Sequence, residues 1–400
     1  MVEQDRQQTS LPLRLIIAGG GTGGHVLPAV SVVGELRRRR IDCAVLWIGS
    51  DDGIERSAAH DLGIEFQSVP TGKFRRYLDA RTAVDALRVP VGVGRAWSIV
   101  RRFQPSVVFS TGGFVSVPTV AASARVAPIL THEQTTILGL ATRLNLRFTD
   151  VLALSHEQTA ARAGSFRGRI TVTGNPVRAS LLEGDPDRCR DRFGFHRDLP
   201  LLYVTGGAKG ASPINARVEA MLPKLLESWQ ILHQAGPPSA NDDAARLRER
   251  RLTWPAHLRG RYHVTDFVGD ELPDVLAAAD LVLSRAGAGT MAELAMLGKP
   301  SILIPLPLSG GGEQIVNAEH MRAAGAAVVI AQADASPDRL LAELAILLGD
   351  RRRLDTMAAA ARSLGKTDAA AALADELLVL AATGHQRRPR LFRPTTETRT

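Results

Sequence analysis

Cysteine is scarce in this chain of 400 residues, which contains only Cys43 and Cys189. Neither has a second cysteine or a histidine at metal-ligand spacing, so the sequence excludes a disulfide scaffold and offers no metal-binding motif. We expect a reducing compartment, no metal and no cofactor. The opening residues, MVEQDRQQTSLPL, lack a basic region followed by an apolar run, which argues against a signal peptide.

A membrane-spanning helix is also missing from the sequence pattern. Residues 103–124 carry no charge and are long enough to cross a bilayer. However, Pro105, the pair Gly112 and Gly113, and Pro118 interrupt this run, so it predicts a strand, a glycine turn and a helix start. Hydrophobic residues at 45% and charged residues at 22% also exclude a disordered or collagen-like chain.

Positive charge is in excess, with 49 Lys plus Arg against 41 Asp plus Glu, a difference of +8. Residues 384–400 hold five arginines and one glutamate, which is +4, half of the excess. With two prolines and almost no apolar periodicity, this stretch predicts an unfolded tail, and residues 1–12 predict an unfolded start. The basic balance alone is compatible with nucleic acid, with an anionic membrane or with no specific partner.

Short runs of Val, Ile and Leu alternate with longer Ala-rich amphipathic segments. The runs are continuous in polarity, as in strands of a parallel sheet covered on both faces. The expected strands are Arg14–Ala18, Ala44–Ile48, Phe66–Val69, Ser106–Ser110, Ile129–Thr131, Val151–Leu154, Ile170–Thr173, Leu201–Thr205, His263–Phe267, Leu281–Ser284, Ser301–Ile304 and Ala327–Ile330. Because one sheet typically holds about 5–6 strands, we predict two doubly wound α/β domains, both Rossmann-like.

The domain boundary should lie near Asn175–Pro200, where prolines, glycines and charges cluster. We place the first domain at residues 13–176 and the second at residues 177–366. Residues 234–249, which contain GPPSAND, predict a surface loop. Residues 73–103 mix Lys and Arg with aromatic and aliphatic side chains. That pattern suits either a surface resting on anionic lipid or a pair of amphipathic helices whose apolar faces join the core.

Three glycine-rich turns follow predicted strands, at Gly19–His25, Thr111–Phe114 and Gly206–Ala211. Such turns bring free amides and a helix amino terminus close to a ligand, so a phosphate is the expected guest. In doubly wound folds the ligand binds at the carboxyl ends of the strands. None of the turns follows the G-x-G-x-x-G pattern with an acidic residue closing the next strand, and none is a Walker A loop.

His25 stands where the first glycine turn meets a helix. A helix amino terminus disfavours imidazolium, so His25 is a candidate general base, or else a histidine that packs locally. In the second half, Arg285–Thr290 is another amide-rich turn, and Glu293 one turn later could hold a ribose diol. Gln314, after a run of three glycines, could read sugar hydroxyls. Both side chains could equally be ordinary solvated helix residues.

Seven segments together resemble the MurG family of N-acetylglucosaminyl transferases. They are GGGTGGHVLPA, TGGFVSVPTVAA, HEQ, TGNPVR, GGAKGA, DFVGDELPDVLAAADLVLSRAGAGTMAEL and EQIVNAEHMRAAGAA. They occur in the family's order, and the match runs over residues 13–383. The resemblance implies a GT-B fold and inverting transfer from UDP-N-acetylglucosamine to a lipid-linked acceptor on undecaprenyl diphosphate, which converts lipid I to lipid II in peptidoglycan synthesis. It further implies an acceptor-binding first domain, a donor-binding second domain and a last helix, at residues 367–383, that packs on the first domain. The family lies peripherally on the cytoplasmic face of the membrane, which favours the lipid interpretation of residues 73–103 and leaves nucleic acid without support.

The resemblance also assigns residues. The catalytic candidates are His25, as base, and Glu133 of the HEQ motif, whose role is less clear. The donor contacts would come from Thr22, Gly23, Gly24, Thr135, Arg178, Ala208, Val268, Ala288, Gly289, Thr290, Glu293 and Gln314. The acceptor diphosphate would meet Gly20, Gly21, Gly112 and Gly113. Within the donor set, Val268 would read uracil with its backbone, Glu293 would hold the ribose, and the Ala288–Thr290 amides would hold phosphate.

This chain departs from the family pattern at several positions. Thr135 replaces the usual Asn, Ala208 and Lys209 replace Ser and Gln, Gly289 replaces a common Leu, and Glu313 is acidic. Three other functions stay open on the sequence: a transferase with another UDP-sugar or acceptor, a UDP-sugar epimerase, and an inactive scaffold on a membrane surface. The sequence does not predict the oligomeric state.

Overall fold

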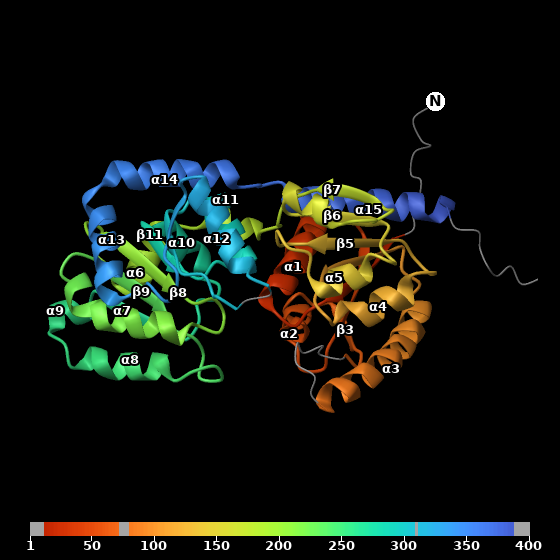
Figure 1. Ribbon diagram of the computed structural model, residues 1–400, viewed down its shortest axis with the longest axis horizontal. Coiled ribbons are helices and arrows are strands. Elements are labelled where there is room, and N and C mark those ends of the chain that lie inside the picture. Colours follow the sequence, from red (N-terminus) through yellow and green to blue (C-terminus); the bar gives the residue numbers. More distant parts are fainter. Residues whose placement is uncertain (1–11, 72–79, 309–310, 388–400) are drawn as a thin grey trace, which may run out of the picture.

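The computed structural model describes the chain except for residues 1–11, 72–79, 309–310 and 388–400. The described residues form two parallel sheets, which lie side by side in Figure 1. The first is seven-stranded, in the order β3-β2-β1-β4-β5-β6-β7, and the second is six-stranded, in the order β10-β9-β8-β11-β12-β13. The strands are β1 Leu13–Gly19, β2 Cys43–Gly49, β3 Glu65–Ser68, β4 Val107–Gly112, β5 Ile129–Glu133, β6 Val151–Leu154, β7 Arg169–Val172, β8 Leu201–Thr205, β9 Gln230–Gln234, β10 Tyr262–Thr265, β11 Leu281–Ser284, β12 Ser301–Leu303 and β13 Ala327–Val329.

Helices follow most of the strands and cover both sheets. In the first half they are α1 Gly23–Arg38, α2 Ile54–Asp61, α3 Ala80–Phe103, α4 Ser116–Ser123, α5 Leu140–Asn145 and the 3-10 turns Glu157–Arg162 and Ala179–Glu183. In the second half they are α6 Pro186–Phe193, α7 Ser212–Leu225, α8 Asp243–Leu252, α9 Ala256–Arg259, α10 Leu272–Ala278, α11 Ala288–Leu297, α12 Glu313–Ala323, α13 Pro337–Gly349, α14 Arg351–Leu364 and α15 Ala369–Arg387. This arrangement confirms the prediction of two doubly wound α/β domains.

The core explains why the strands read as continuous apolar runs. In β1, Leu15 and Ile17 join one buried cluster with residues of α1 and α15. The alternating Ile16 and Ala18 join another cluster with residues of α3 and α4. Because successive side chains of a strand point to opposite faces, a strand covered on both faces must be apolar at every position.

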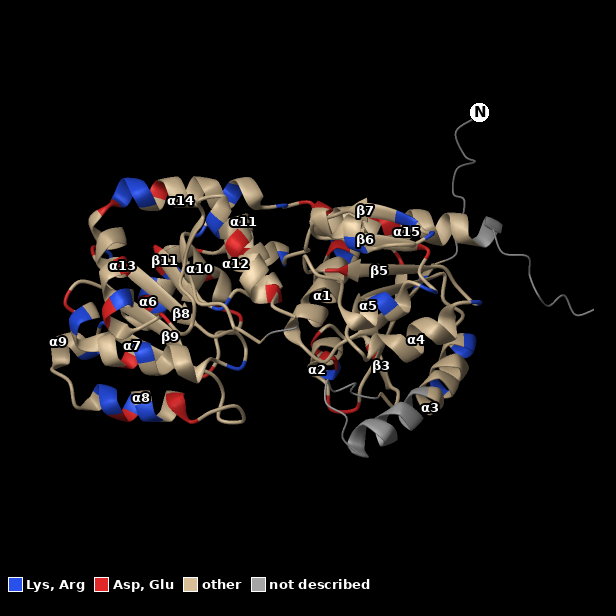
Figure 2. Ribbon diagram, in the orientation of Figure 1, with Lys and Arg blue, Asp and Glu red and all other residues tan. Residues whose placement is uncertain are grey.

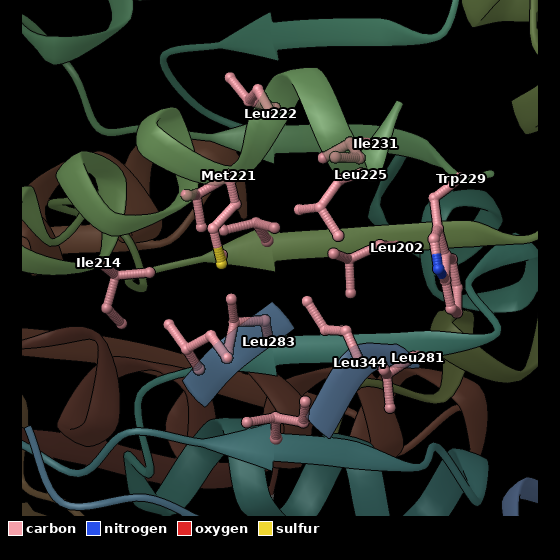
Figure 3. Close-up of a cluster of buried hydrophobic side chains, with 14 of the residues drawn as sticks. Leu202, Ile214, Met221, Leu222, Leu225, Trp229, Ile231, Leu281, Leu283 and Leu344 are labelled. Atoms are coloured by element: carbon pink, nitrogen blue, oxygen red, sulfur yellow. The ribbon is translucent and has the colours of Figure 1, made fainter. Parts of the chain in front are cut away.

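The second sheet repeats this design. Leu202 and Val204 of β8 pack with α7 and α13, whereas Leu201 and Tyr203 pack on the other face with α6 and α10. Figure 3 shows the first of these clusters, where the α7 side chains meet the sheet beside Trp229.

One strand and one helix were not expected from the sequence. Residues 230–234 form β9 between β8 and β10, and the predicted loop at 234–249 contains most of α8, so that prediction is wrong. The segment QILHQ begins and ends with polar residues, which hid it among the apolar runs. Its polar side chains are buried because they have hydrogen-bond partners; Gln230, for example, bridges the His196 backbone.

Two long-range connections tie the domains together. The expected boundary segment contains α6, which packs on α10 of the second domain. At the other end, the chain leaves α14 and crosses back as α15, which packs on α1, β4 and β5 (Figure 1). α15 runs to Arg387, so the first four residues of the predicted tail are helical; the rest of the tail, like residues 1–11, lies outside the described residues. No helix in the described residues has the length and apolarity needed to cross a membrane.

Candidate functional site

The His25 ring is held at the first glycine turn by a backbone carbonyl. Its Nδ1 lies 3.0 Å from the Thr111 carbonyl oxygen, which also accepts a hydrogen bond of 2.9 Å from Gln134 Nε2. A carbonyl only accepts, so Nδ1 carries the proton and Nε2 carries the lone pair. His25 can therefore accept a proton at Nε2 without changing tautomer.

The charge state of His25 follows from its half-buried position. Burial lowers its pKa below the ordinary 6.5, while the negative charge of Glu133, the Thr111 carbonyl and the negative charge of Glu55 oppose that shift. The net direction is downward, so the ring is neutral and basic at neutral pH.

The second glycine turn packs directly against the His25 ring. Gly112 and Gly113 have φ of +91° and +76°, a region that favours glycine. A Cβ on Gly113 would lie 3.0 Å from His25 Cδ2 and 2.7 Å from the Gly20 carbonyl oxygen. The approach of the ring thus requires these glycines, independently of the acceptor diphosphate that the sequence assigned to them.

Glu55, which the sequence reasoning missed, occupies the first glycine turn. Its fully buried carboxylate accepts hydrogen bonds of 2.8 Å from the amides of Gly21 and Ser50, and one of 2.6 Å from the Ser50 hydroxyl. A Cβ on Gly20 would come within 2.6 Å of this carboxylate. The Gly21 amide is therefore engaged by Glu55 and is not free for the acceptor diphosphate that the sequence assigned to it.

The amides nearest the start of α1 are open. Those of Gly23 and Gly24 have no hydrogen-bond partner among the described residues, and Thr22 is the exposed residue before the helix. A Cβ on Gly23 would meet nothing within 4 Å, whereas one on Gly24 would lie 3.3 Å from Gln134 Oε1. Gly23 therefore borders open space, whereas Gly24 packs against Gln134; the donor contacts assigned to both stay a prediction.

Glu133 holds a loop. Its Oε1 accepts from the Thr135 amide at 3.2 Å and the Thr135 hydroxyl at 3.0 Å, and its Oε2 accepts from the Gly139 amide at 3.0 Å. The Thr135 hydroxyl also lies 2.5 Å from the Ile137 carbonyl oxygen. These bonds fold residues 135–139 around a buried carboxylate, so the geometry makes Glu133 a positioning group and engages the Thr135 hydroxyl within its own loop.

The proposed donor site begins at the amino end of α11. Gly287 precedes the helix, and the first helical hydrogen bond is from Met291 to Gly287, which leaves the amides of Ala288, Gly289 and Thr290 unpaired within the helix. Glu293 follows one turn later. Burial raises its pKa to about 7, against the opposing positive charge of Arg178.

Arg178 faces this helix from the interdomain segment. Its Nε is buried and has no hydrogen-bond partner among the described residues. A cavity of about 10 Å³ lies between α1 and α11, and it is lined by Arg178, Glu293, Gly289, Gly24 and Leu27. That is room for about one water, so α1 and α11 are closely packed at Arg178 and Glu293.

The remaining donor candidates lie around the same edge of the sheet. Val268 is buried, and its amide already donates to Gln234 Oε1 at 2.9 Å, so only its carbonyl is left to read a base. Gln234 also donates to the Gly207 carbonyl at 2.8 Å and so braces the turn that presents the exposed Ala208. Gln234 was missed because its strand was missed.

The amino end of α12 brings the second domain towards the first. Gln314 Oε1 accepts from the Leu306 amide at 3.0 Å, which anchors the preceding loop. Burial raises the pKa of Glu313, and the charge of Glu133 on the first domain raises it further. The negative charge of the first domain is therefore felt at the amino end of α12. Among the described residues, no three His, Cys, Asp or Glu side chains are grouped to hold a metal ion.

Comparison with known proteins gives the class and then the family. Residues 15–153 match the glycosyltransferase family 28 N-terminal domain, and residues 201–374 match its C-terminal domain. The solved MurG of Acinetobacter baumannii is similar, with a TM-score of 0.68 and 25% identity over 92% of this chain and 100% of that one. The chain is thus a family 28 glycosyltransferase with the GT-B fold, as the sequence motifs predicted.

Curated relatives identify which family of glycosyltransferases the chain belongs to. One from Treponema pallidum (strain Nichols) is 38% identical over 91% of this chain and 94% of its own length. One from Exiguobacterium sibiricum is 37% identical over 92% and 99%. Both carry the same name, and the chain belongs to that family: the UDP-N-acetylglucosamine--N-acetylmuramyl-(pentapeptide) pyrophosphoryl-undecaprenol N-acetylglucosamine transferases. A UDP-N-acetylglucosamine 2-epimerase from Neisseria meningitidis, at 13% identity and a TM-score of 0.64, shares the fold alone.

Proposed function

We propose that this chain transfers N-acetylglucosamine from UDP-N-acetylglucosamine to the C4 hydroxyl of the N-acetylmuramoyl unit of a lipid-linked pentapeptide acceptor, converting lipid I to lipid II. Family membership supports the reaction. The observation that carries the mechanism is the His25–Thr111 hydrogen bond of 3.0 Å, which leaves Nε2 of a neutral imidazole as the proton acceptor.

The reaction we infer is a single displacement at C1 of the donor sugar. The bond from the acceptor O4 to C1 forms while the bond from C1 to the diphosphate oxygen breaks, which inverts the configuration at C1. The hydroxyl proton passes to His25 Nε2, and UDP leaves with the bonding electron pair. No other group is needed to balance this step.

Stabilisation of the leaving UDP is the second requirement. The three unpaired amides at the start of α11 and the Arg178 guanidinium would face the diphosphate, because a helix amino terminus and a guanidinium both favour negative charge. Glu293 would accept hydrogen bonds from the ribose hydroxyls. The lipid-linked acceptor would approach from the first domain, beside His25.

A membrane contact on α3 would bring the enzyme to its lipid acceptor. Trp97 and Val91 are 49% and 62% exposed, whereas Ile99 and Val100 on the other side of α3 are buried in the core. The Arg101 guanidinium lies 4.7 Å from the Trp97 ring centroid. Residues 80–103 form one helix, α3, whose buried side joins the core, and we infer that its exposed side rests on lipid. Residues 72–79 lie outside the described residues. We infer peripheral binding to an anionic membrane, on the cytoplasmic face.

The test is incubation with UDP-N-acetylglucosamine and a water-soluble lipid I analogue, with UDP and the disaccharide product both measured. Transferase activity yields the two products in equal amounts and none without acceptor. Conversion of the donor without acceptor would indicate an epimerase. Absence of UDP release by folded protein would indicate a scaffold. Replacing the donor with other UDP-sugars tests the specificity that Thr135 and Ala208 leave open.

A further inference from the structure

A second cavity lies at the opposite edge of the six-stranded sheet from the proposed donor site. Its volume is about 550 Å³, and its walls come from α6, the α10–β11 turn, the α11–β12 turn and α14. These turns precede β11 and β12, so the cavity lies at the amino ends of those strands, whereas α11 begins at the carboxyl end of β11. The body of α11, about 15 Å long, separates the two sites.

Positive charge dominates the walls of this cavity. Four cations line it, Arg190, Lys299, Arg351 and Arg362, against two carboxylates, Asp280 and Asp355, which leaves 4 − 2 = +2. Basic positions at both ends of α14 are visible in Figure 2.

The two carboxylates are already engaged. Arg351 binds both of them, with Nη1 at 3.1 Å from Asp280 and Nε at 3.3 Å from Asp355. Asp280 also accepts from the Leu201 amide at 2.9 Å. Both acids thus bind Arg351, and no described carboxylate forms an ion pair with Arg190, Lys299 or Arg362.

Arg190 and Arg362 are the uncompensated guanidinium groups. Neither has a side-chain hydrogen bond or ion pair to another described residue, and the Nε of Arg190 is buried without an acceptor. A buried donor without a partner costs about 1–3 kcal/mol, and more when it is charged. Such a group calls for an acceptor that the protein itself does not supply.

Arg362 approaches Gly298 closely. Gly298, at φ +64°, ends α11, and a Cβ there would lie 2.5 Å from Arg362 Nε and 2.8 Å from Arg362 Cζ. The Arg362 side chain therefore occupies the space that a Cβ at position 298 would need. Lys299 stands beside it, with Nζ donating to the carbonyls of Ala277 and Ala279 at 3.0 and 2.9 Å.

The positive charges along the cavity repel one another. Burial lowers the pKa of Lys299 to about 8; Asp280 opposes this shift, and the positive charges of Arg362, Arg190 and Arg351 add to it. An anion among these groups would relieve their mutual repulsion.

We propose that this cavity is a binding site for a small phosphorylated anion, held between the guanidinium groups of Arg190 and Arg362 with Lys299 beside them. Guanidinium groups bind phosphate oxygens through two parallel N–H donors, and the cavity volume is that of an ordinary small-molecule site. The site is separate from the donor site, because it shares no lining residue with the Arg178–Glu293 cavity.

The test is isothermal titration of the full chain with inorganic pyrophosphate at pH 7, with saturating UDP present to fill the donor site. We expect binding in the presence of UDP, weakened at least about tenfold in the R190Q/R362Q double variant, since a charged hydrogen bond is worth about 1.5–3 kcal/mol. The matched control is Arg352→Gln on the same helix, an exposed residue that does not line the cavity; its affinity should equal that of the wild type.

Two results would overturn the proposal: unchanged pyrophosphate affinity in the double variant, or loss of binding when UDP is added. Thermal unfolding of each variant checks that it folds. If the double variant does not fold, Arg362→Gln alone decides, because Arg362 is exposed and its replacement leaves the core intact.

Discussion

The His25 imidazole donates its Nδ1 proton to the Thr111 carbonyl over 3.0 Å, and this bond determines which ring nitrogen is basic. Thr111 lies at the end of β4, and His25 lies at the start of α1, which follows β1. Because β1 and β4 are neighbouring strands, they bring the two residues together and fix the orientation of the lone pair on Nε2. The same carbonyl also accepts from Gln134, which joins the HEQ motif to the base.

Replacement of His25 by asparagine separates its hydrogen bond to Thr111 from its proposed role as proton acceptor. His25→Asn keeps a side-chain N–H near Thr111 but has no basic nitrogen, so we expect kcat to fall by about 10²–10⁴, the range for loss of a general base. The dissociation constant for UDP should stay within about twofold, because Arg178, Glu293 and the amides of α11, which we propose to hold UDP, are unchanged in this variant. Steady-state assays and UDP titration measure the two effects, and wild-type turnover in this variant would exclude His25 as base.

The pH dependence should show two separate transitions. Protonated His25 cannot accept a proton, and burial lowers its pKa below 6.5, so kcat should rise with pH on the acid side of 6.5 and be level above about pH 7. Glu293, with a pKa of about 7, must be ionised to accept from a ribose, so donor affinity should rise between pH 6 and 8. Glu293→Gln should abolish the change in affinity and keep the change in kcat. Identical pH profiles of donor affinity in Glu293→Gln and in the wild type would contradict the assignment of Glu293.

Glu133 should behave as a positioning residue. Glu133→Gln loses the acceptor for one of its three backbone and hydroxyl partners, which should cost about 1–3 kcal/mol in unfolding free energy. The negative charge of Glu133 raises the pKa of His25, so its removal should shift the kcat transition to lower pH, with less than about tenfold loss of kcat on the plateau. Denaturant unfolding and the pH profile are the measurements. Thr135→Ser, which keeps the hydroxyl, is the control, and loss of the pH transition in Glu133→Gln would instead indicate a catalytic role.

Much of the fold could be predicted because strands covered on both faces must be apolar throughout, as Leu15–Ala18 are. The strand β9 escaped because buried polar residues such as Gln230 are tolerated only when partners elsewhere satisfy them, and a linear pattern does not show those partners. The glycine turns could be predicted because they are local features of the sequence, and they indicated the candidate site. The side chain that binds such a turn can come from a distant part of the chain: the carboxylate beside Gly21 belongs to Glu55, 34 residues away.

Gly113 should tolerate no side chain. With φ of +76° and a Cβ that would lie 2.7 Å from the Gly20 carbonyl oxygen, Gly113→Ala should cost about 1–3 kcal/mol in stability and displace the His25 ring. The matched control is Gly34→Ala in α1, where a Cβ would meet nothing within 4 Å. That variant should gain up to about 1 kcal/mol and keep full activity. Thermal unfolding and turnover of both variants test this, and equal stability of the two would contradict the packing argument.

Trp97 should carry a measurable part of the membrane affinity. A tryptophan buried in a headgroup region removes apolar area from water, and each nearby Lys or Arg adds about 1 kcal/mol on an anionic surface; Arg95, Arg101 and Arg102 are exposed on the same helix. Trp97→Ser should therefore weaken co-sedimentation with phosphatidylglycerol vesicles several-fold and leave turnover of a water-soluble acceptor unchanged. Leu252→Ser, at a 67% exposed position on α8 of the second domain, is the control and should bind vesicles as the wild type does. If both variants bind equally well, the lipid-facing surface is not on α3.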